Sequence, residues 1–298
     1  MNLKKLDNTH EPIIILGAAR SGTKILRDTI AAHPLLVPIP YDVNFVWKYG
    51  LYDIKHDELS PDELTKRGNK FIHHFFSNFH QNRSNIRVVE KTVSNTVRVD
   101  FVHKVFPNCQ FIHIIRDGRD VAVSSMKQWQ APLNRKMVLN KLKYFPIKAL
   151  PNYALQYALS YFFRIISREK RVLTWGVVLR DLEELLDRYS LLEVCGIQWQ
   201  RCVTSSINTL KYMNDDKKIE VRYESLVENP TYEIQRLLEF LNLKYSKEMI
   251  TNMAQKIRSS DINKWEKTVN VIELRQLMLL IQNTMNHLGY LEAKHIEI

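Results

Sequence analysis

Long apolar runs are absent from this sequence. No stretch of about 18 apolar residues occurs, which is the length that a membrane-spanning helix needs, so we predict no transmembrane segment. The first eleven residues are polar and lack the apolar core of a secretory signal peptide. We therefore expect the chain to work in the cytoplasm.

Cysteine is also scarce. The three cysteines, Cys109, Cys195 and Cys202, form no C-x-x-C pair, so we expect neither a zinc site nor a disulfide framework. This usage is typical of a reducing compartment. No cluster of histidine, cysteine and acidic residues has the spacing of metal ligands, and we predict no metal site.

Positive charge is in excess, with 43 Lys and Arg against 32 Asp and Glu and a net charge of +11. Residues 127–180 hold eleven of the basic residues and one acid. Such a run is typical of a solvated surface, and it also fits a platform for an anionic acceptor or a peripheral contact with a lipid surface. No nucleic-acid-binding motif accompanies it, so we expect no nucleic-acid partner.

Short apolar runs alternate with helical patterns through the first 130 residues. Strands are expected at 12–17, 35–39, 86–90, 110–115 and 218–223. Helices are expected at 22–32, 60–79, 95–106, 118–129, 190–212, 230–241, 246–257 and 272–288. This alternation is typical of parallel βαβ units. We predict a P-loop-like α/β fold with a central, mainly parallel sheet between layers of helices. It forms a single domain over 1–298 with a basic helical insertion at about 130–190.

A glycine-containing turn at 17–24 joins the first expected strand to the first expected helix. Backbone N–H groups at such a turn cradle an anion, although the same turn also occurs without a ligand. A kinase loop places lysine directly after its last glycine, whereas Thr23 follows Gly22 here and Lys24 comes one position late. A shift of one position along a helix turns the side chain by about 100° around the helix axis. The cation in this loop is Arg20, which favours a metal-free transfer with a guanidinium on the leaving group.

At this loop the chain resembles the sulfotransferase superfamily, in which the motif R/K-S-G-T-[TS] binds the phosphosulfate end of the donor. The matching residues are Arg20, Ser21, Gly22 and Thr23, while Lys24 stands where the family has a hydroxyl. The resemblance implies that these five positions bind the donor, 3′-phosphoadenosine-5′-phosphosulfate (PAPS).

A second match lies about 95 residues further on and again follows an expected strand. The family motif R-D-x-R-x-x-x-x-S binds the 3′-phosphate of the donor, and the resemblance carries this role to Arg116 and Ser124. The alternative interpretation is a charged helix start, in which Asp117 and Asp120 favour the helix dipole. Two such motifs on two strand-to-helix turns indicate a sulfotransferase.

Three shorter segments also resemble the family. Glu90-Lys91-Thr92 resembles its E-K-T segment, which implies that Lys91 contacts the bridging oxygen or the sulfuryl group. The segment around Tyr223 resembles V-R-Y-E-D-L, which lies near the nucleotide. The C-terminal S-x-x-x-[KR]-W loop, which closes over the donor, matches Ser260, Lys264 and Trp265. Taken singly, each segment is also an ordinary strand end or helix cap.

The resemblance implies sulfuryl transfer from PAPS to an acceptor hydroxyl, with adenosine 3′,5′-bisphosphate as the product. Such a transfer benefits from a general base, and Asp42 is our candidate because the family places an acid or histidine on the segment after the second strand. Asp42 also fits an Asx-turn or a helix cap, and Glu90 and His33 are the other candidates for the base. Arg20 and Lys91 would stabilise the sulfuryl group and the departing phosphate.

The acceptor is less defined. The motifs resemble the tyrosylprotein and glycan sulfotransferases more than the cytosolic steroid and phenol enzymes, and the basic, aromatic-rich insertion favours an anionic saccharide or a glycolipid. Two other functions remain open from the residues alone. One is a P-loop kinase acting on a nucleotide or small molecule, and the other is a non-catalytic basic module that binds anionic glycan or membrane.

Overall fold

The computed structural model describes residues 11–79, 85–131, 175–257 and 262–291. In this part of the chain five strands form one sheet with the order β2-β3-β1-β4-β5, and each neighbouring pair is parallel. The strands are β1 (Ile13–Leu16), β2 (Leu36–Pro38), β3 (Arg87–Glu90), β4 (Gln110–Ile115) and β5 (Lys218–Arg222). The predicted α/β fold and its five strands are confirmed.

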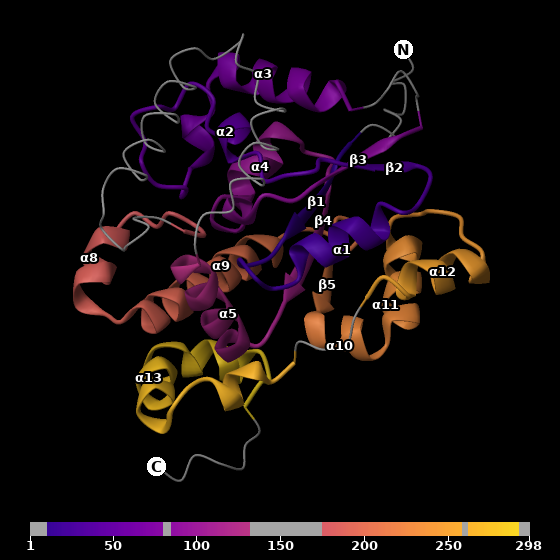
Figure 1. Cartoon of the computed structure of the whole chain (residues 1–298). Helices are drawn as coiled ribbons and strands as arrows, with labels where there is room; N and C mark the ends of the chain where they lie inside the picture. The colour runs from indigo at the N-terminus through magenta and orange to yellow at the C-terminus, as the bar shows by residue number, and fades with distance from the viewer. Residues whose placement is uncertain (1–10, 80–84, 132–174, 258–261, 292–298) are drawn as a thin grey trace.

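Helices cover both faces of the sheet (Figure 1). The central strand β1 is apolar at every position and fully buried, as parallel sheets between two helical layers require. Its residues alternate, so Ile13 and Ile15 join one core and Ile14 and Leu16 the other. The first core includes α1 (Thr23–Ile30), α10 (Tyr223–Glu228), α11 (Pro230–Phe240) and α12 (Lys247–Ala254). The second includes α2 (Asn44–Trp47), α3 (Lys66–Ser77) and α4 (Val99–Val105).

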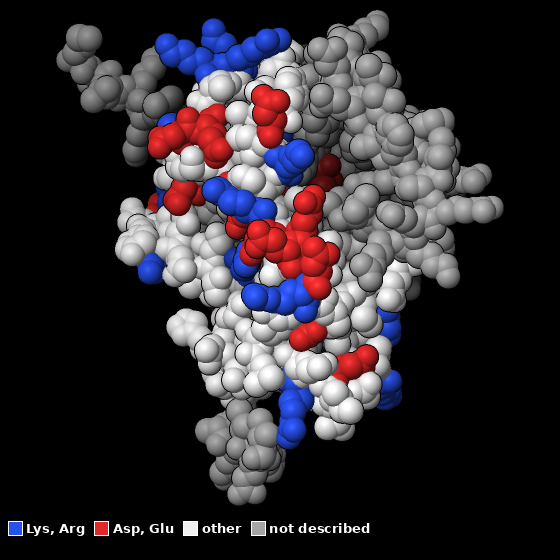
Figure 2. All heavy atoms as spheres, turned by 90° about the vertical axis from the view of Figure 1, so that its left-hand side faces the viewer, with Lys and Arg blue, Asp and Glu red and all other residues white. Residues whose placement is uncertain are grey.

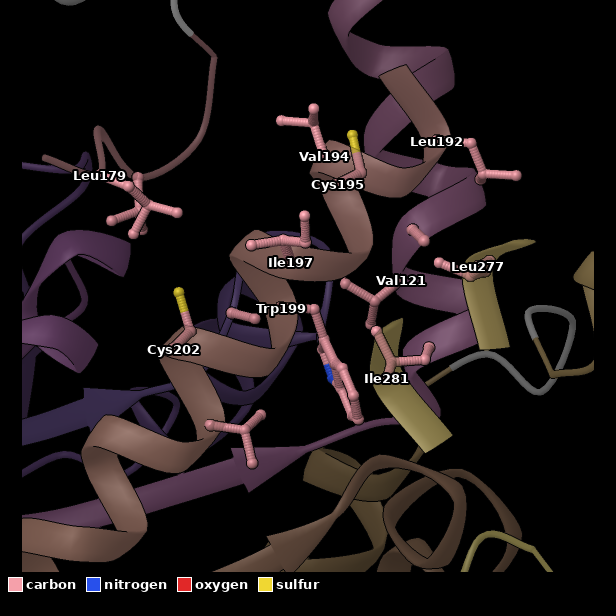
Figure 3. Packing of buried hydrophobic residues seen from close by; sticks show 14 of the residues in the cluster. Val121, Leu179, Leu192, Val194, Cys195, Ile197, Trp199, Cys202, Leu277 and Ile281 are labelled. Carbon is pink, nitrogen blue, oxygen red and sulfur yellow. The ribbon is translucent and has the colours of Figure 1, made fainter. Parts of the chain in front are cut away.

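A third apolar cluster joins α5 (Gly118–Gln130) to the helices of the C-terminal half (Figure 3). The cluster includes Trp199, whose indole N–H donates to the Arg116 carbonyl at 3.0 Å. A Cβ on Gly118 would lie 2.7 Å from the Trp199 ring, so only glycine lets the start of α5 approach this closely. The helices are α5 (Gly118–Gln130), α8 (Leu182–Arg188), α9 (Leu191–Leu210) and α13 (Val271–His287).

Two of the expected helices were wrong in detail. The helix expected at 60–79 is a 3₁₀ turn (Pro61–Glu63) followed by α3, because Leu64 is extended and the Thr65 hydroxyl caps the Gly68 N–H at 2.9 Å. The helix expected at 95–106 is a 3₁₀ turn (Val93–Val97) followed by α4, with the break at Arg98. The sequence pattern does not indicate α2 or α10.

The basic insertion predicted at about 130–190 lies largely outside the described residues, and α8 is a helix within its described part. On the face shown in Figure 2, acidic and basic side chains of the described residues are interspersed. None of the helices described has the length and apolar character to span a bilayer.

Candidate active site

The turn after β1 has the backbone of an anion-binding loop. It enters α1 through Gly22, which has a φ of 89° and occupies the N-cap without a capping side chain. A Cβ on Gly22 would lie 2.4 Å from Cδ2 of Tyr223, so both the φ and the space require glycine. The first N–H groups of a helix have no partner within it, and at α1 no capping side chain occupies them.

Ser21 in this loop is fully buried, and its hydroxyl has no hydrogen-bond partner among the described residues. Leaving such a donor unpaired costs about 1–3 kcal/mol. A phosphate or sulfate oxygen in the loop would accept this hydrogen bond. The residues present therefore fit an anionic ligand.

The second strand-to-helix turn meets the first. Strands β1 and β4 are neighbours, so Arg116 after β4 donates from Nη1 to the Arg20 carbonyl at 3.1 Å. In return, Arg20 Nε donates to Ser124 Oγ in α5 at 3.0 Å. The Arg116 guanidinium also stacks 4.4 Å from the centre of the Tyr223 ring. The structure thus brings together four residues that the sequence predicted to bind the donor.

Asp120 connects the C-terminal segment to Arg116 through hydrogen bonds. Its buried carboxylate accepts from Arg116 Nη2 at 3.2 Å, from the Asn263 N–H at 2.9 Å and from the Trp265 N–H at 3.0 Å. The sequence pattern alone relates Asp120 only to the helix dipole. The signal that was missed is its position only four residues after Arg116, which is close enough for an ion pair across the start of α5.

Trp265 faces the second motif. The Arg119 guanidinium lies 4.2 Å from the centre of the Trp265 ring and pairs with Asp117 at 2.6 Å. Lys264 is exposed in the same short 3₁₀ turn (Lys264–Lys267), and Ser260 lies outside the described residues. Donor contacts by Lys264 and Ser260 stay predictions.

Two of the three candidate catalytic residues, Asp42 and Lys91, pair with each other. Lys91 Nζ, after β3, lies 2.5 Å from Asp42 Oδ1, after β2. The side chain of Lys91 is 12% exposed and that of Asp42 is 35% exposed, so the carboxylate remains accessible. Val43, rather than Asp42, is the N-cap of α2, and no side chain caps this helix. A helix-capping role for Asp42 is therefore not supported.

The other two candidates for the base are buried. Burial, with a smaller contribution from the negative charge of Asp42, raises the pKa of Glu90 to about 7. Glu90 Oε2 accepts from the Asn95 side chain at 2.9 Å. Both ring nitrogens of His33 bond the main chain, at Lys244 O and at Leu35 N, which leaves neither for an acceptor hydroxyl.

Lys24 points away from the loop. Its side chain is 77% exposed and lies 2.6 Å from Asp28 Oδ2, one turn along α1. Its donor contact stays a prediction. Among the described residues no group of three or more histidine, cysteine or acidic side chains is placed to hold a metal ion.

Residues 12–163 match the sequence model of the sulfotransferase family, which is just over half of the 298 residues. The chain belongs to the sulfotransferase family. A curated relative, an uncharacterized protein of Aquifex aeolicus (strain VF5), is 27% identical over 128 residues, which cover 39% of this chain and 17% of that protein. The chain thus spans less than a fifth of that relative.

Solved sulfotransferases have the same fold. The sulfotransferase domain from the curacin biosynthetic pathway superposes with a TM-score of 0.53 at 16% identity, over 94% of this chain and 98% of that one. A sulfotransferase of Mycobacterium avium gives 0.57 at 13% identity, over 94% and 77%. A mouse sulfotransferase complexed with PAP gives 0.50 at 15% identity, over 92% and 84%.

Proposed function

We propose that this sulfotransferase family member moves a sulfuryl group from PAPS to an acceptor hydroxyl. Membership of the family supports the reaction type. The observation that carries the donor is the contact between the two motifs, Arg116 to the Arg20 carbonyl and Arg20 to Ser124. This contact brings two guanidinium groups and a hydroxyl from the two turns close together. A ligand that carries phosphate groups at both ends needs such an arrangement. The related mouse structure contains PAP, the desulfated donor.

Each part of the donor has residues that suit it. The N–H groups at the start of α1 and the unpaired Ser21 hydroxyl suit the phosphosulfate end. Arg116 and Ser124 suit the 3′-phosphate, because a guanidinium forms charge-assisted hydrogen bonds to phosphate. Trp265, held by Asp120, offers an aromatic surface beside them.

The Asp42 and Lys91 pair suits the transfer itself. When bound, the donor supplies the sulfuryl group. The Asp42 carboxylate would take the proton of the acceptor hydroxyl as the new O–S bond forms. The Lys91 ammonium would balance negative charge on the phosphate oxygen as the old S–O bond breaks. The pair thus provides a base and a cation at one place without a metal.

Calorimetry with adenosine 3′,5′-bisphosphate in the absence of Mg²⁺ tests the donor. We expect tight binding of the bisphosphate and none of AMP, and loss of binding in Arg116→Ala. Arg201→Ala is the matched control, because it removes an arginine from an ion pair with Asp181 that is about one-third exposed. A preference for ATP with Mg²⁺ would instead support a kinase. No binding of any nucleotide would leave a non-catalytic basic module as the better account.

For the acceptor we propose a saccharide or a glycolipid. The support is the composition of residues 127–180, which are basic and rich in aromatic residues and of which 132–174 lie outside the described residues. The same residues would give peripheral contact with an anionic lipid surface. A sulfation screen should find saccharide acceptors whose use weakens with added salt, and a screen that found only phenols or steroids would contradict the proposal.

A further inference from the structure

Consecutive residues of the loop that carries Asp42 contact consecutive residues of the segment after β3. The Asp42 carboxylate pairs with Lys91, and the next residue, Val43, donates its N–H to the Thr92 hydroxyl at 2.8 Å. Both contacts join a loop after β2 to residues about 50 positions later. The position of the candidate base therefore depends on contacts with a distant segment.

Asn44, the first residue of α2 and two positions after Asp42, is part of a longer chain of hydrogen bonds. Its Oδ1 accepts from Arg98 Nη2 at 2.7 Å, and its Nδ2 donates to Asp57 Oδ1 at 2.8 Å. On the other side, Arg98 Nε donates to Asn95 Oδ1 at 2.9 Å, and Asn95 Nδ2 donates to Glu90 Oε2 at 2.9 Å. We call these five residues the Arg98 network. In it, two amides join one guanidinium to two carboxyl groups.

The polarity of both amides is consistent. The side-chain amides of Asn44 and Asn95 both direct the carbonyl oxygen to the Arg98 guanidinium and the NH₂ group to a carboxyl group. Each end of the amide dipole therefore faces the group of opposite charge. Asp57 is held further by the Ser94 hydroxyl at 2.7 Å and by the Val178 N–H at 2.9 Å. The network is thus anchored in three segments that are far apart in the sequence.

Burying the charged groups of this network is unfavourable in free energy. Arg98 is 2% exposed, Asp57 is 1% exposed, and Glu90 and Asn95 are not exposed. Taking a charged group out of water costs several kcal/mol, and apolar residues of similar volume often stabilise a fold as well or better. A connected polar network does something that apolar packing does not, because its directional bonds specify one arrangement. The arrangement specified here is that of the Asp42 loop.

We propose that Arg98 is a positioning residue that holds Asp42 and Lys91 in the geometry for transfer, acting through Asn44. This inference rests on the proposed function. Binding of the desulfated donor should not depend on Arg98, since the residues assigned to its phosphates follow β1 and β4, whereas the network joins the segments after β2 and β3. A displacement of about 1 Å of a catalytic group can cost roughly 100-fold in rate.

The experiment compares Arg98→Lys and Asn44→Leu with the wild type. Lysine keeps the charge but lacks the planar fork that reaches both amides, and leucine fills the space of Asn44 without its hydrogen bonds. We expect kcat to fall about 10- to 100-fold in each variant. The KM for PAPS and the affinity for adenosine 3′,5′-bisphosphate should stay within about twofold. Arg201→Met is the matched control and should change none of these.

A readout independent of activity is the acetylation rate of Lys91 with acetic anhydride, followed by mass spectrometry against the exposed Lys211. If the network positions the pair, Asn44→Leu should raise the relative rate at Lys91 at least threefold. Unchanged labelling with unchanged kcat would overturn the proposal. A parallel loss of kcat, nucleotide affinity and stability would also overturn it, since a purely structural role predicts that result. A wild type without transfer activity refutes the proposed function, and the labelling still tests the positioning.

Discussion

Replacing Asp120 tests how the donor site is held together. Its carboxylate is the common acceptor for Arg116 and for the N–H groups of Asn263 and Trp265. Asp120→Ala would leave a buried guanidinium without this partner and two backbone donors without an acceptor. We therefore expect both a loss of stability and a loss of donor affinity.

The magnitude follows from burial. The side chains of Arg116 and Asp120 are 7% and 1% exposed, and removing one partner of a buried pair costs about 3–5 kcal/mol. Arg116 keeps the Arg20 carbonyl and the Tyr223 ring, so we expect the lower end, about 3 kcal/mol. For a chain of 298 residues, this loss lowers the melting temperature by about 5 °C. Asp120→Asn keeps one acceptor oxygen and should cost about half as much.

Urea unfolding and calorimetry with adenosine 3′,5′-bisphosphate measure the two effects. The control is Asp181→Ala, which breaks the pair with Arg201 at 2.5 and 2.7 Å. That pair is about one-third exposed, so its loss should cost about 1 kcal/mol or less and leave nucleotide affinity unchanged. If Asp120→Ala costs under about 1 kcal/mol and binds the bisphosphate as the wild type does, the role assigned to Asp120 is wrong.

Three further predictions concern single residues. Gly22→Ala should lower the free energy of unfolding by about 2 kcal/mol or more, since its φ is positive and its Cβ would meet Tyr223; a wild-type urea midpoint would contradict this. Lys24→Ala should change bisphosphate affinity less than about threefold, because the ammonium is exposed and paired with Asp28; a tenfold loss in calorimetry would restore its donor role. Burial lowers the pKa of His113 to about 3, so the unfolded chain binds a proton that the folded chain excludes. The free energy of unfolding should therefore fall as the pH drops from about 6.5 toward 3, and His113→Leu should flatten that dependence in urea titrations at several pH values.

The parts of this protein that the sequence predicts well are local in origin. An apolar run such as Ile13–Leu16 that ends at a glycine indicates a strand buried on both faces, and the structure has one there. The ends of adjacent parallel strands meet at one edge of the sheet. Residues placed after several strands therefore converge, as Arg20 and Arg116 do.

The parts that were missed depend on distant partners. Asp120 bonds main-chain groups more than 140 residues away, so nothing beside it in the sequence shows that it joins two segments. Arg98 lies in a stretch with a helical pattern, yet it interrupts that helix with a φ of −148° while its side chain reaches Asn44. A periodic pattern records only which face is apolar, so it cannot show that a buried polar network overrides the helix.

The strand order also determines when the protein can assemble during synthesis. Strand β1 emerges first, but its neighbours β3 and β4 begin only at Arg87 and Gln110. At roughly 5–20 residues per second, this apolar strand waits several seconds on the ribosome for its first partner. Pairing over such sequence separations is slow and leaves the strand open to aggregation. The donor site is completed still later, when the segment containing Trp265 has been made and can reach Asp120.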